Sequence, residues 1–417
     1  MAIETAASTA LITSDIVVFG LIAATLGAIF YLASGPTPFW KKFFAWVPAL
    51  LLCYFVPALY NTTGLIDGEG SQLYYFASRV LLPAALVLLT LSVDLKGVLK
   101  LGPRLLFVFC AGSLGIVLGA IVSFQLMEWF WPAAVAGDTW RGMAALAGSW
   151  LGGGANMVAI REIYEVDATL FGQFAVIDVA YASLLLATLL FLANRAEQID
   201  ARSGADTAAI DEMRERIAAY EAANARIPTL TDLMVIIGLA FGIVALAHAV
   251  SSPIAAWFAT NMEWASRFSL DSNFVWVVVL STLAGLGLSF TRVRQLENAG
   301  ASRIGTVCLY FLIACIGMQM HFLRLAERPE LLLIGGIWMA VHVLTIWGAA
   351  RLVKAPLFYF AVGSQGNIGA AASAPVVAAA FHPTLAPVGV LLGTVGYATG
   401  TVIAYFIGQI LRIMAGQ

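Results

Sequence analysis

Long apolar segments dominate this chain of 417 residues and decide the solvent in which it folds. Hydrophobic residues make up 61% of the sequence and charged residues only 11%, whereas about 25% of the residues of a soluble domain are charged. A helix that crosses the hydrocarbon of a bilayer needs about 20 mostly apolar residues, and roughly ten or more segments provide them here. We therefore expect an all-α polytopic membrane protein with about 10 to 12 transmembrane segments.

The segments form two halves around one polar stretch. About six apolar segments lie between residues 15 and 193, and about six more lie between 232 and 411. We predict a first membrane repeat at 1-194, a polar linker at 195-231 and a second membrane repeat at 232-417. Within the linker, Asp211 to Arg226 mixes charged with isolated apolar residues, as a solvated or surface-lying helix does. We interpret this segment as a tether.

Three landmarks recur in the same order in the two halves. They are Ser78-Arg79 with Ser302-Arg303, Gly148-Ser149 with Gly363-Ser364, and the segment 178–183 (DVAYAS) with 394–399 (TVGYAT). One match of small residues in apolar helices is weak evidence, but three matches in order indicate duplication.

The second landmark begins a glycine motif, which reads GSWLGGGAN at 148–156 and GSQGNIGAA at 363–371. Glycine costs roughly 1 kcal/mol relative to alanine inside a helix, so these clusters mark places where the backbone leaves regular helix. Within a membrane such breaks are tolerated only where protein or an aqueous cavity surrounds them. Their N–H groups can bind anions and their carbonyls can coordinate Na⁺. We therefore predict a substrate site at Ser149, Gly152, Gly153, Gly154, Asn156, Ser364, Gln365, Asn367 and Gly369. The alternative is that the small residues only let helices pack closely.

The distribution of Lys and Arg indicates whether the glycine segments cross the membrane or return. If every segment crosses, the 22 basic residues divide 13 to 9, with five of the 13 in the linker. If both glycine segments return as re-entrant hairpins, each half has five crossings and the division becomes 15 to 7, or 10 to 7 without the linker. Positive residues favour the cytoplasm. We therefore predict two inverted repeats, each with five spanning helices plus a re-entrant hairpin or broken helix, with both termini outside and the linker cytoplasmic.

Asp178 lies near the middle of the apolar segment 168–193. A carboxylate there costs about 2.5 to 3.5 kcal/mol on insertion scales, which makes it a candidate for binding a cation or a proton. Thr394 stands at the matching place in the second half. We predict that Asp178, Asn156, Asn367 and Thr394 bind a coupling ion, Na⁺ or H⁺. In the structural alternative, Asp178 pairs with a helix terminus or faces water.

Other polar residues give weaker indications. Arg161 and Glu162 follow the first glycine motif and could approach a substrate from its rim, although adjacent charges at a helix end usually belong to the membrane interface. His248 and His342 lie in apolar segments, where a histidine more often bonds a neighbouring helix than shuttles protons.

Several classes of function fit poorly. The chain has no HExxH, P-loop or Cys/His metal spacing, and no GxSxG with partners, so we expect neither an enzyme nor a cofactor. A net charge of −2 without a basic cluster argues against nucleic acid as a partner. The N-terminus lacks the basic region that opens a signal peptide, so we expect the first apolar segment to remain as a span.

The glycine motifs, extended as GSWLGGGANMVAIRE and GSQGNIGAAASAPVVAAA, together with GTVGYATGTVIAYFIG, resemble a bacterial and plastid membrane family called domain of unknown function 819. The resemblance covers nearly the whole chain. That family is grouped with the cation:proton antiporter and anion transporter superfamily, which includes sodium:glutamate and 2-hydroxycarboxylate symporters. The resemblance implies inverted repeats, paired hairpins, frequent dimers and movement of a core against a scaffold, like an elevator. It carries over to the segments 148–156 and 363–369 and to Glu162. The second motif departs from the near-identical hairpins of sodium:glutamate symporters, which argues against glutamate specificity.

These patterns predict a secondary active transporter of the bacterial inner membrane, a Na⁺-coupled symporter of a small organic anion working by alternating access. We expect a homodimer in membrane lipid, in which the last three segments of each half form the moving core. One rival is a cation/proton antiporter that uses Asp178. Another is a non-transporting membrane receptor or scaffold that signals through the linker.

Overall fold

The computed structural model describes residues 10–68, 70–203, 227–320 and 327–417. Within these ranges the regular secondary structure is helical, and one isolated bridge joins Ile12 to Ile66. The predicted helix from Asp211 to Arg226 lies outside the described residues.

The chain is a membrane protein by the length and composition of its helices. Seven helical segments of the described chain are long and apolar enough to cross a bilayer, and up to nine are if each bent helix pair is one span. The seven are Asp15–Ala33, Leu73–Leu91, Pro103–Phe130, Ala168–Ala193, Leu230–Asn261, Leu331–Leu352 and Pro383–Met414. The all-helical fold and the multiple spans expected from the sequence are thus confirmed, at 7 to 9 candidate spans.

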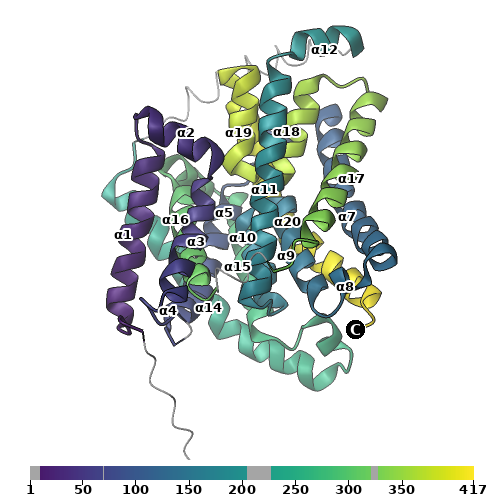
Figure 1. The fold of residues 1–417 in the computed structure, drawn as a ribbon. Coiled ribbons are helices and arrows are strands. Elements are labelled where there is room, and N and C mark those ends of the chain that lie inside the picture. The colour runs from purple at the N-terminus through teal and green to yellow at the C-terminus, as the bar shows by residue number, and fades with distance from the viewer. Residues whose placement is uncertain (1–9, 69, 204–226, 321–326) are drawn as a thin grey trace, which may run out of the picture.

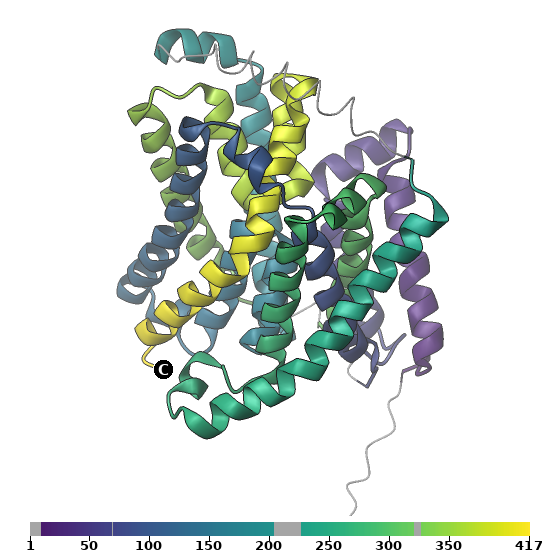
Figure 2. The same cartoon turned by 180° about the vertical axis from the view of Figure 1, so that it is seen from behind.

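The helices pack as two groups. In the first group α5 packs against three helices from the other half of the chain, α14, α15 and α16 (Figures 1 and 2). This group consists of α1 (Asp15–Ala33), α2 (Pro38–Trp46), α3 (Ala49–Thr62), α4 (Leu73–Phe76), the π-helical turn η1 (Ala77–Leu81), α5 (Leu82–Leu91), α14 (Leu230–Asn261), η2 (Ala265–Phe268), α15 (Asn273–Ser289), η3 (Arg292–Ala299) and α16 (Ala301–Gly317). We call it the outer group.

The second group, which we call the inner group, holds both glycine motifs. It consists of α7 (Pro103–Phe130), α9 (Thr139–Gly152), α10 (Gly154–Ile163), α11 (Ala168–Ala193), α17 (Leu331–Leu352), α18 (Leu357–Ile368), α19 (Ala370–Phe381) and α20 (Ala386–Met414). Its short connections are α8 (Pro132–Val135) and η5 (Pro383–Leu385), while α6 (Leu95–Leu99) precedes α7 and α12 (Ala196–Ser203) follows α11. Small residues bring α7 and α17 together, because a Cβ atom on Gly115 would lie 3.0 Å from the Cα atom of His342.

The first glycine motif forms a helical hairpin, α9–α10, which we call hairpin 1. Gly153 separates its two arms with a backbone φ of 83° and ψ of −179°, a conformation that is essentially confined to glycine. The open ends of the arms meet again, because the rings of Trp140 and Tyr164 lie 5.2 Å apart and the Arg141 guanidinium donates to the Tyr164 carbonyl at 2.9 Å. Both ends of the motif therefore lie on the same side.

The second motif forms hairpin 2, α18–α19, in the same way. The rings of Phe358 and Phe381, at its open ends, lie 5.4 Å apart. Closer to the turn, the Gln365 amide donates to the Ser373 hydroxyl at 2.6 Å. The glycine segments are thus hairpins that return, and not bends within two continuous spans.

The two hairpins enter the inner group from opposite ends of α20. Hairpin 2 leads through η5 directly into the first turn of α20. Trp140, at the open end of hairpin 1, donates to Gln417, three residues beyond the last turn of that helix. The helix has 29 residues, which corresponds to about 43 Å between its ends.

Candidate functional site

The tips of the hairpins meet in the interior of the inner group. A Cβ atom on Gly153 would lie 3.2 Å from the Cβ atom of Ala370, so the two turns are in contact. Gly152 approaches the middle of α20 even more closely, because its Cβ would lie 2.1 Å from the Gly396 carbonyl oxygen. Ala370 itself has a φ of +45°, which is unusual for a residue with a side chain. We take this junction as the candidate site.

On hairpin 1, Ser149 and Asp178 lie together. The Ser149 hydroxyl donates to one carboxylate oxygen of Asp178 at 2.8 Å, and the Trp150 indole N–H donates to the other at 2.9 Å. All three residues are buried. The carboxylate on α11 therefore fixes the first arm of hairpin 1 just before its turn. Thr394, its predicted counterpart, instead bonds the Leu391 carbonyl of its own helix at 2.9 Å.

Asn156 ties the second arm of hairpin 1 to α20. Its amide N–H donates to the Gly396 carbonyl at 2.8 Å, and its carbonyl oxygen accepts from the Thr401 hydroxyl at 2.9 Å. The residue is completely buried. Asn156 thus lies at the predicted site, with its amide bonded to the protein.

On hairpin 2, Asn367 lies near the end of the first arm. Its amide donates to the carbonyls of Phe109 at 3.0 Å and Gly363 at 2.9 Å, and its oxygen accepts from Ser113 at 2.6 Å. Both N–H groups and the carbonyl are therefore engaged. Asn367 ties hairpin 2 to α7, as Asn156 ties hairpin 1 to α20.

Ser364 meets a histidine that the sequence did not place at the site. His342 Nε2 lies 2.8 Å from the Ser364 oxygen, and Nδ1 lies 3.0 Å from the Gly112 carbonyl. A carbonyl only accepts, so Nδ1 carries a proton, and in the neutral ring Nε2 accepts from the serine. The prediction that His342 and His248 bond neighbouring helices is confirmed, since His248 contacts the Arg79 carbonyl at 2.8 Å.

Gln365 carries a buried acceptor that bonds none of the described residues. Its amide nitrogen donates to Ser373, but its carbonyl oxygen has no hydrogen bond within the described chain. The residue is 1% exposed. Gly369 makes room for this pair, because a Cβ atom there would lie 2.5 Å from the Gln365 nitrogen and 1.6 Å from the Ser373 oxygen. Gly154, by contrast, faces nothing closer than Leu309 at 3.9 Å.

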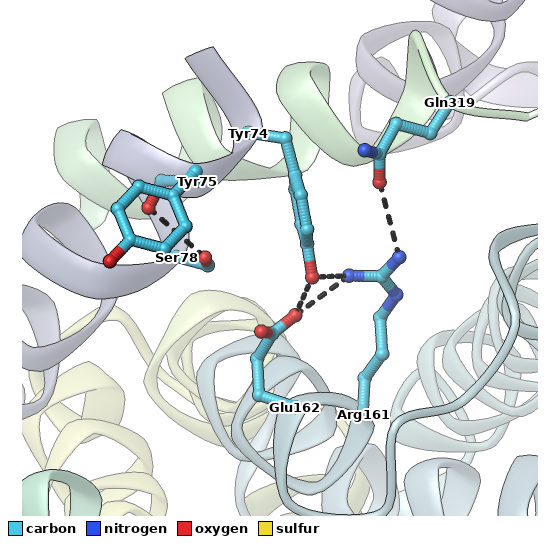
Figure 3. Close-up of polar contacts among 6 residues, drawn as sticks. All are labelled: Tyr74, Tyr75, Ser78, Arg161, Glu162 and Gln319. Atoms are coloured by element: carbon cyan, nitrogen blue, oxygen red, sulfur yellow. Dashed lines mark hydrogen bonds and ion pairs between the residues drawn. The ribbon is translucent and has the colours of Figure 1, made fainter. Parts of the chain in front are cut away.

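A second polar cluster lies at the open end of hairpin 1, where it meets the outer group (Figure 3). Arg161 and Glu162 form an ion pair at 2.7 Å, with each side chain 5% exposed. The Tyr74 hydroxyl accepts from Arg161 and donates to Glu162, and Gln319 accepts from Arg161 at 3.4 Å. The sequence indicated the two charges but gave no sign of Tyr74 or Gln319, which lie 87 and 158 residues from Arg161.

This cluster borders a cavity of about 430 Å³, lined also by Arg79, Glu165 and Asp167. Asp167 accepts the first backbone N–H groups of α11 as its N-terminal cap. The Arg79 guanidinium lies 4.0 Å from the centre of the Phe274 ring, as in a cation–π contact. The cavity lies between the two helix groups and is mostly polar.

Comparison with known proteins places the chain in a family. A family model described as "Protein of unknown function (DUF819)" matches residues 20–414. The chain is also similar to the uncharacterized membrane protein YjcL of Bacillus subtilis (strain 168), with 24% identity over 361 residues. That alignment covers 84% of this chain and 86% of the relative. The resemblance to the 819 family seen in the glycine motifs is therefore confirmed.

Proposed function

The chain belongs to the DUF819 family of membrane proteins, and on that premise we propose that it is a secondary active transporter. In this proposal it is a Na⁺-coupled symporter of a small organic anion, and not an enzyme. The observation that carries the proposal is the contact between Gly153 and Ala370, where two hairpins from opposite ends of the inner group meet. Re-entrant backbone inside a membrane protein is tolerated only where protein surrounds it or where it lines an aqueous cavity, and a binding site supplies such a place.

The chemistry at the tips supports binding of an anion together with a cation. The N-termini of α10 and α19 and the C-termini of α9 and α18 all converge there. Helix N-termini favour anions, and helix C-termini with free carbonyls favour cations. The unpaired Gln365 oxygen adds a buried acceptor that a cation or a ligand N–H would satisfy. Asn156 lies three residues after Gly153, and Asp178 bonds Ser149, which lies four residues before Gly153.

We propose that the two halves are inverted repeats with five crossings each. The hairpins enter from opposite ends of α20, as inversion requires. Besides the longer helices, α16 with 17 residues and the bent pairs 38–62 and 273–299 would supply the remaining crossings. The excess of Lys and Arg on the side of the linker supports a cytoplasmic linker and outside termini in the bacterial inner membrane.

We further propose that the inner group is the moving core and that the outer group is the scaffold and dimer face. The hairpins, α7 and α11, α17 and α20 pack mainly with one another, and few contacts join them to the outer group. Exposed apolar side chains along α14, such as Leu246 and Trp257, fit contact with lipid or with a second copy.

Ion-dependent stability tests the proposal with purified protein. Na⁺ at a hundred times its dissociation constant would stabilise the folded protein by about 2.7 kcal/mol, and K⁺ or choline would not. Asp178→Asn should abolish this response, whereas Asp167→Asn, at a surface cap, should retain it. Equal melting temperatures in Na⁺, K⁺ and choline, with and without a solute library, would contradict the proposal.

Flux in proteoliposomes separates symport from the antiport alternative. The buried Asp178 carboxylate favours that alternative as the second candidate. Symport requires an organic solute as well as a Na⁺ gradient, whereas antiport requires only a cation and a pH gradient. Deletion of residues 200–225 distinguishes the non-transporting receptor, because a receptor would lose its output while keeping any solute binding.

A further inference from the structure

The polar cluster at the base of hairpin 1 joins the two helix groups. Arg161 and Glu162 belong to α10 of the inner group, while Tyr74 belongs to α4 and Gln319 follows α16, both in the outer group (Figure 3). The Arg161 guanidinium also lies over the Tyr74 ring, 4.7 Å from its centre. These four residues therefore bridge the boundary across which the core would have to move.

The charges of this cluster are not divided between the two helix groups. Both ions belong to the same helix, and among the described residues the outer group contributes the Tyr74 hydroxyl and the Gln319 amide. Separating an ion pair across a boundary leaves an unpaired buried charge, which is strongly destabilising. Here Arg161 and Glu162 lie 2.7 Å apart on one helix, so parting the groups would leave the ion pair together and would remove its contacts with the uncharged side chains of Tyr74 and Gln319.

The surroundings favour such a separation. The adjoining cavity of about 430 Å³ offers room for water to replace the lost partners. Arg161 also has an Nε donor without a partner in the described chain, so its hydrogen-bonding capacity is not exhausted in this arrangement.

We propose that Tyr74 and Gln319 hold the Arg161–Glu162 pair as a separable latch between the two helix groups. The latch stabilises the arrangement seen here and opens when the inner group moves. This inference rests on the proposed function, because it assigns the latch to the movement of a transporter core. The latch would control the movement of the inner group from a place outside the hairpin tips.

Double electron–electron resonance, which measures the distance between two spin labels, tests the latch with the full chain in lipid nanodiscs. Cys53, Cys110, Cys308 and Cys315 are replaced, and spin labels are placed at two exposed residues, Trp129 of the inner group and Trp264 of the outer group. Tyr74→Phe removes only the hydroxyl that contacts both ions. We expect two distances between the labels, one for the arrangement seen here and one for the separated groups. The population with the second distance, relative to that with the first, should rise about ten- to a hundredfold, as expected for losing a hydrogen bond to a charged group.

Tyr75→Phe is the matched control, because Tyr75 is the next residue, is exposed and lies outside the cluster (Figure 3). It should leave the distances unchanged. Gln319→Leu should shift them in the same direction as Tyr74→Phe but less, since its bond is longer. Gln319→Leu also provides the test of the latch if Tyr74→Phe does not fold.

Shifts below twofold in both latch variants, or an equal shift in Tyr75→Phe, overturn the latch. Flux measured on the same variants keeps this result distinct from the proposed function. Unchanged distances in a protein that carries solute reject the latch alone. Altered distances in a protein that carries neither solute nor ion reject the transporter and with it the role given to the latch.

Discussion

Three consecutive glycines at the tip of hairpin 1 should respond differently to replacement by alanine. A Cβ atom on Gly152 would lie 2.1 Å from the Gly396 carbonyl oxygen, so the backbone of one of the two elements must shift. At Gly153 the obstacle is the torsion itself, with φ of 83° and ψ of −179°. Gly154 has ordinary torsions and no atom closer than 3.9 Å. The three variants therefore separate the effect of a steric clash at Gly152 from that of torsional strain at Gly153, with Gly154 as the position that has neither.

The magnitudes follow from these geometries. A residue with a side chain in the torsional region of Gly153 costs about 1 to 3 kcal/mol. Overpacking at Gly152 costs about 1 to 3 kcal/mol and more when rigid backbone must move, so we expect Gly152→Ala to be the most damaging. Gly154→Ala should be neutral or stabilise by up to about 1 kcal/mol, because alanine is the better helix former.

Hydrogen exchange of peptides covering 148–158 measures local opening of the tip directly. Each 1.4 kcal/mol corresponds to about a tenfold loss of protection, so Gly153→Ala should lose roughly five- to a hundredfold and Gly152→Ala at least as much. Gly154→Ala should retain or improve the protection of the wild type. The torsional reasoning is wrong if Gly154→Ala opens the tip as much as Gly153→Ala, or if Gly153→Ala exchanges like the wild type.

Further predictions concern the contacts that hold the hairpins. Burial raises the pKa of Asp200, while the Leu357 amide, which donates to its carboxylate at the start of hairpin 2, acts in the opposite direction; burial is the larger effect, so the docked arrangement favours the protonated form. Protection of that amide, corrected for intrinsic exchange, should therefore fall as pH rises through the raised pKa, and Asp200→Asn should remove the dependence. Asn367→Asp should lower the melting temperature clearly, because it places a carboxylate oxygen where the amide N–H groups now donate to two carbonyls. The expected cost is about 1 to 3 kcal/mol or more. A melting temperature equal to that of the wild type would show that the amide is not bonded as described. Ser149→Ala should cost about 1 to 3 kcal/mol by leaving one oxygen of the Asp178 carboxylate without its donor, and a melting temperature unchanged from the wild type would contradict this.

The hairpins could be predicted because their cause is local. Clustered glycines reveal a break wherever they occur in an apolar segment, and the division of Lys and Arg then favours a return over a crossing. The turn of hairpin 1 indeed lies at Gly153, inside the predicted motif. In hairpin 2 the residue with positive φ is Ala370, one position after Gly369. Nothing in its residue type indicated this.

The partners of the polar residues could not be predicted, because they come from distant parts of the chain. Asn156 bonds a carbonyl 240 residues away, and Asn367 bonds one 258 residues away. The sequence indicated that both amides lie near the glycine motifs, but it could not show that the protein itself engages them. Whether they also bind a ligand stays a prediction. Tyr74 was missed for the same reason, since a tyrosine in an apolar segment has no distinctive pattern.

Helix α20 determines how the two tips meet. A Cβ atom on Gly396 would lie 2.7 Å from the Cα atom of Gly152, and one on Gly393 would lie 2.3 Å from the carbonyl carbon of Ala370. One helix thus holds both turns through backbone contacts made possible by its own glycines. Strained torsions such as that of Ala370 persist only where the surrounding structure over-determines them. Because the same helix holds both turns through its backbone, a displacement of α20 would displace both tips together.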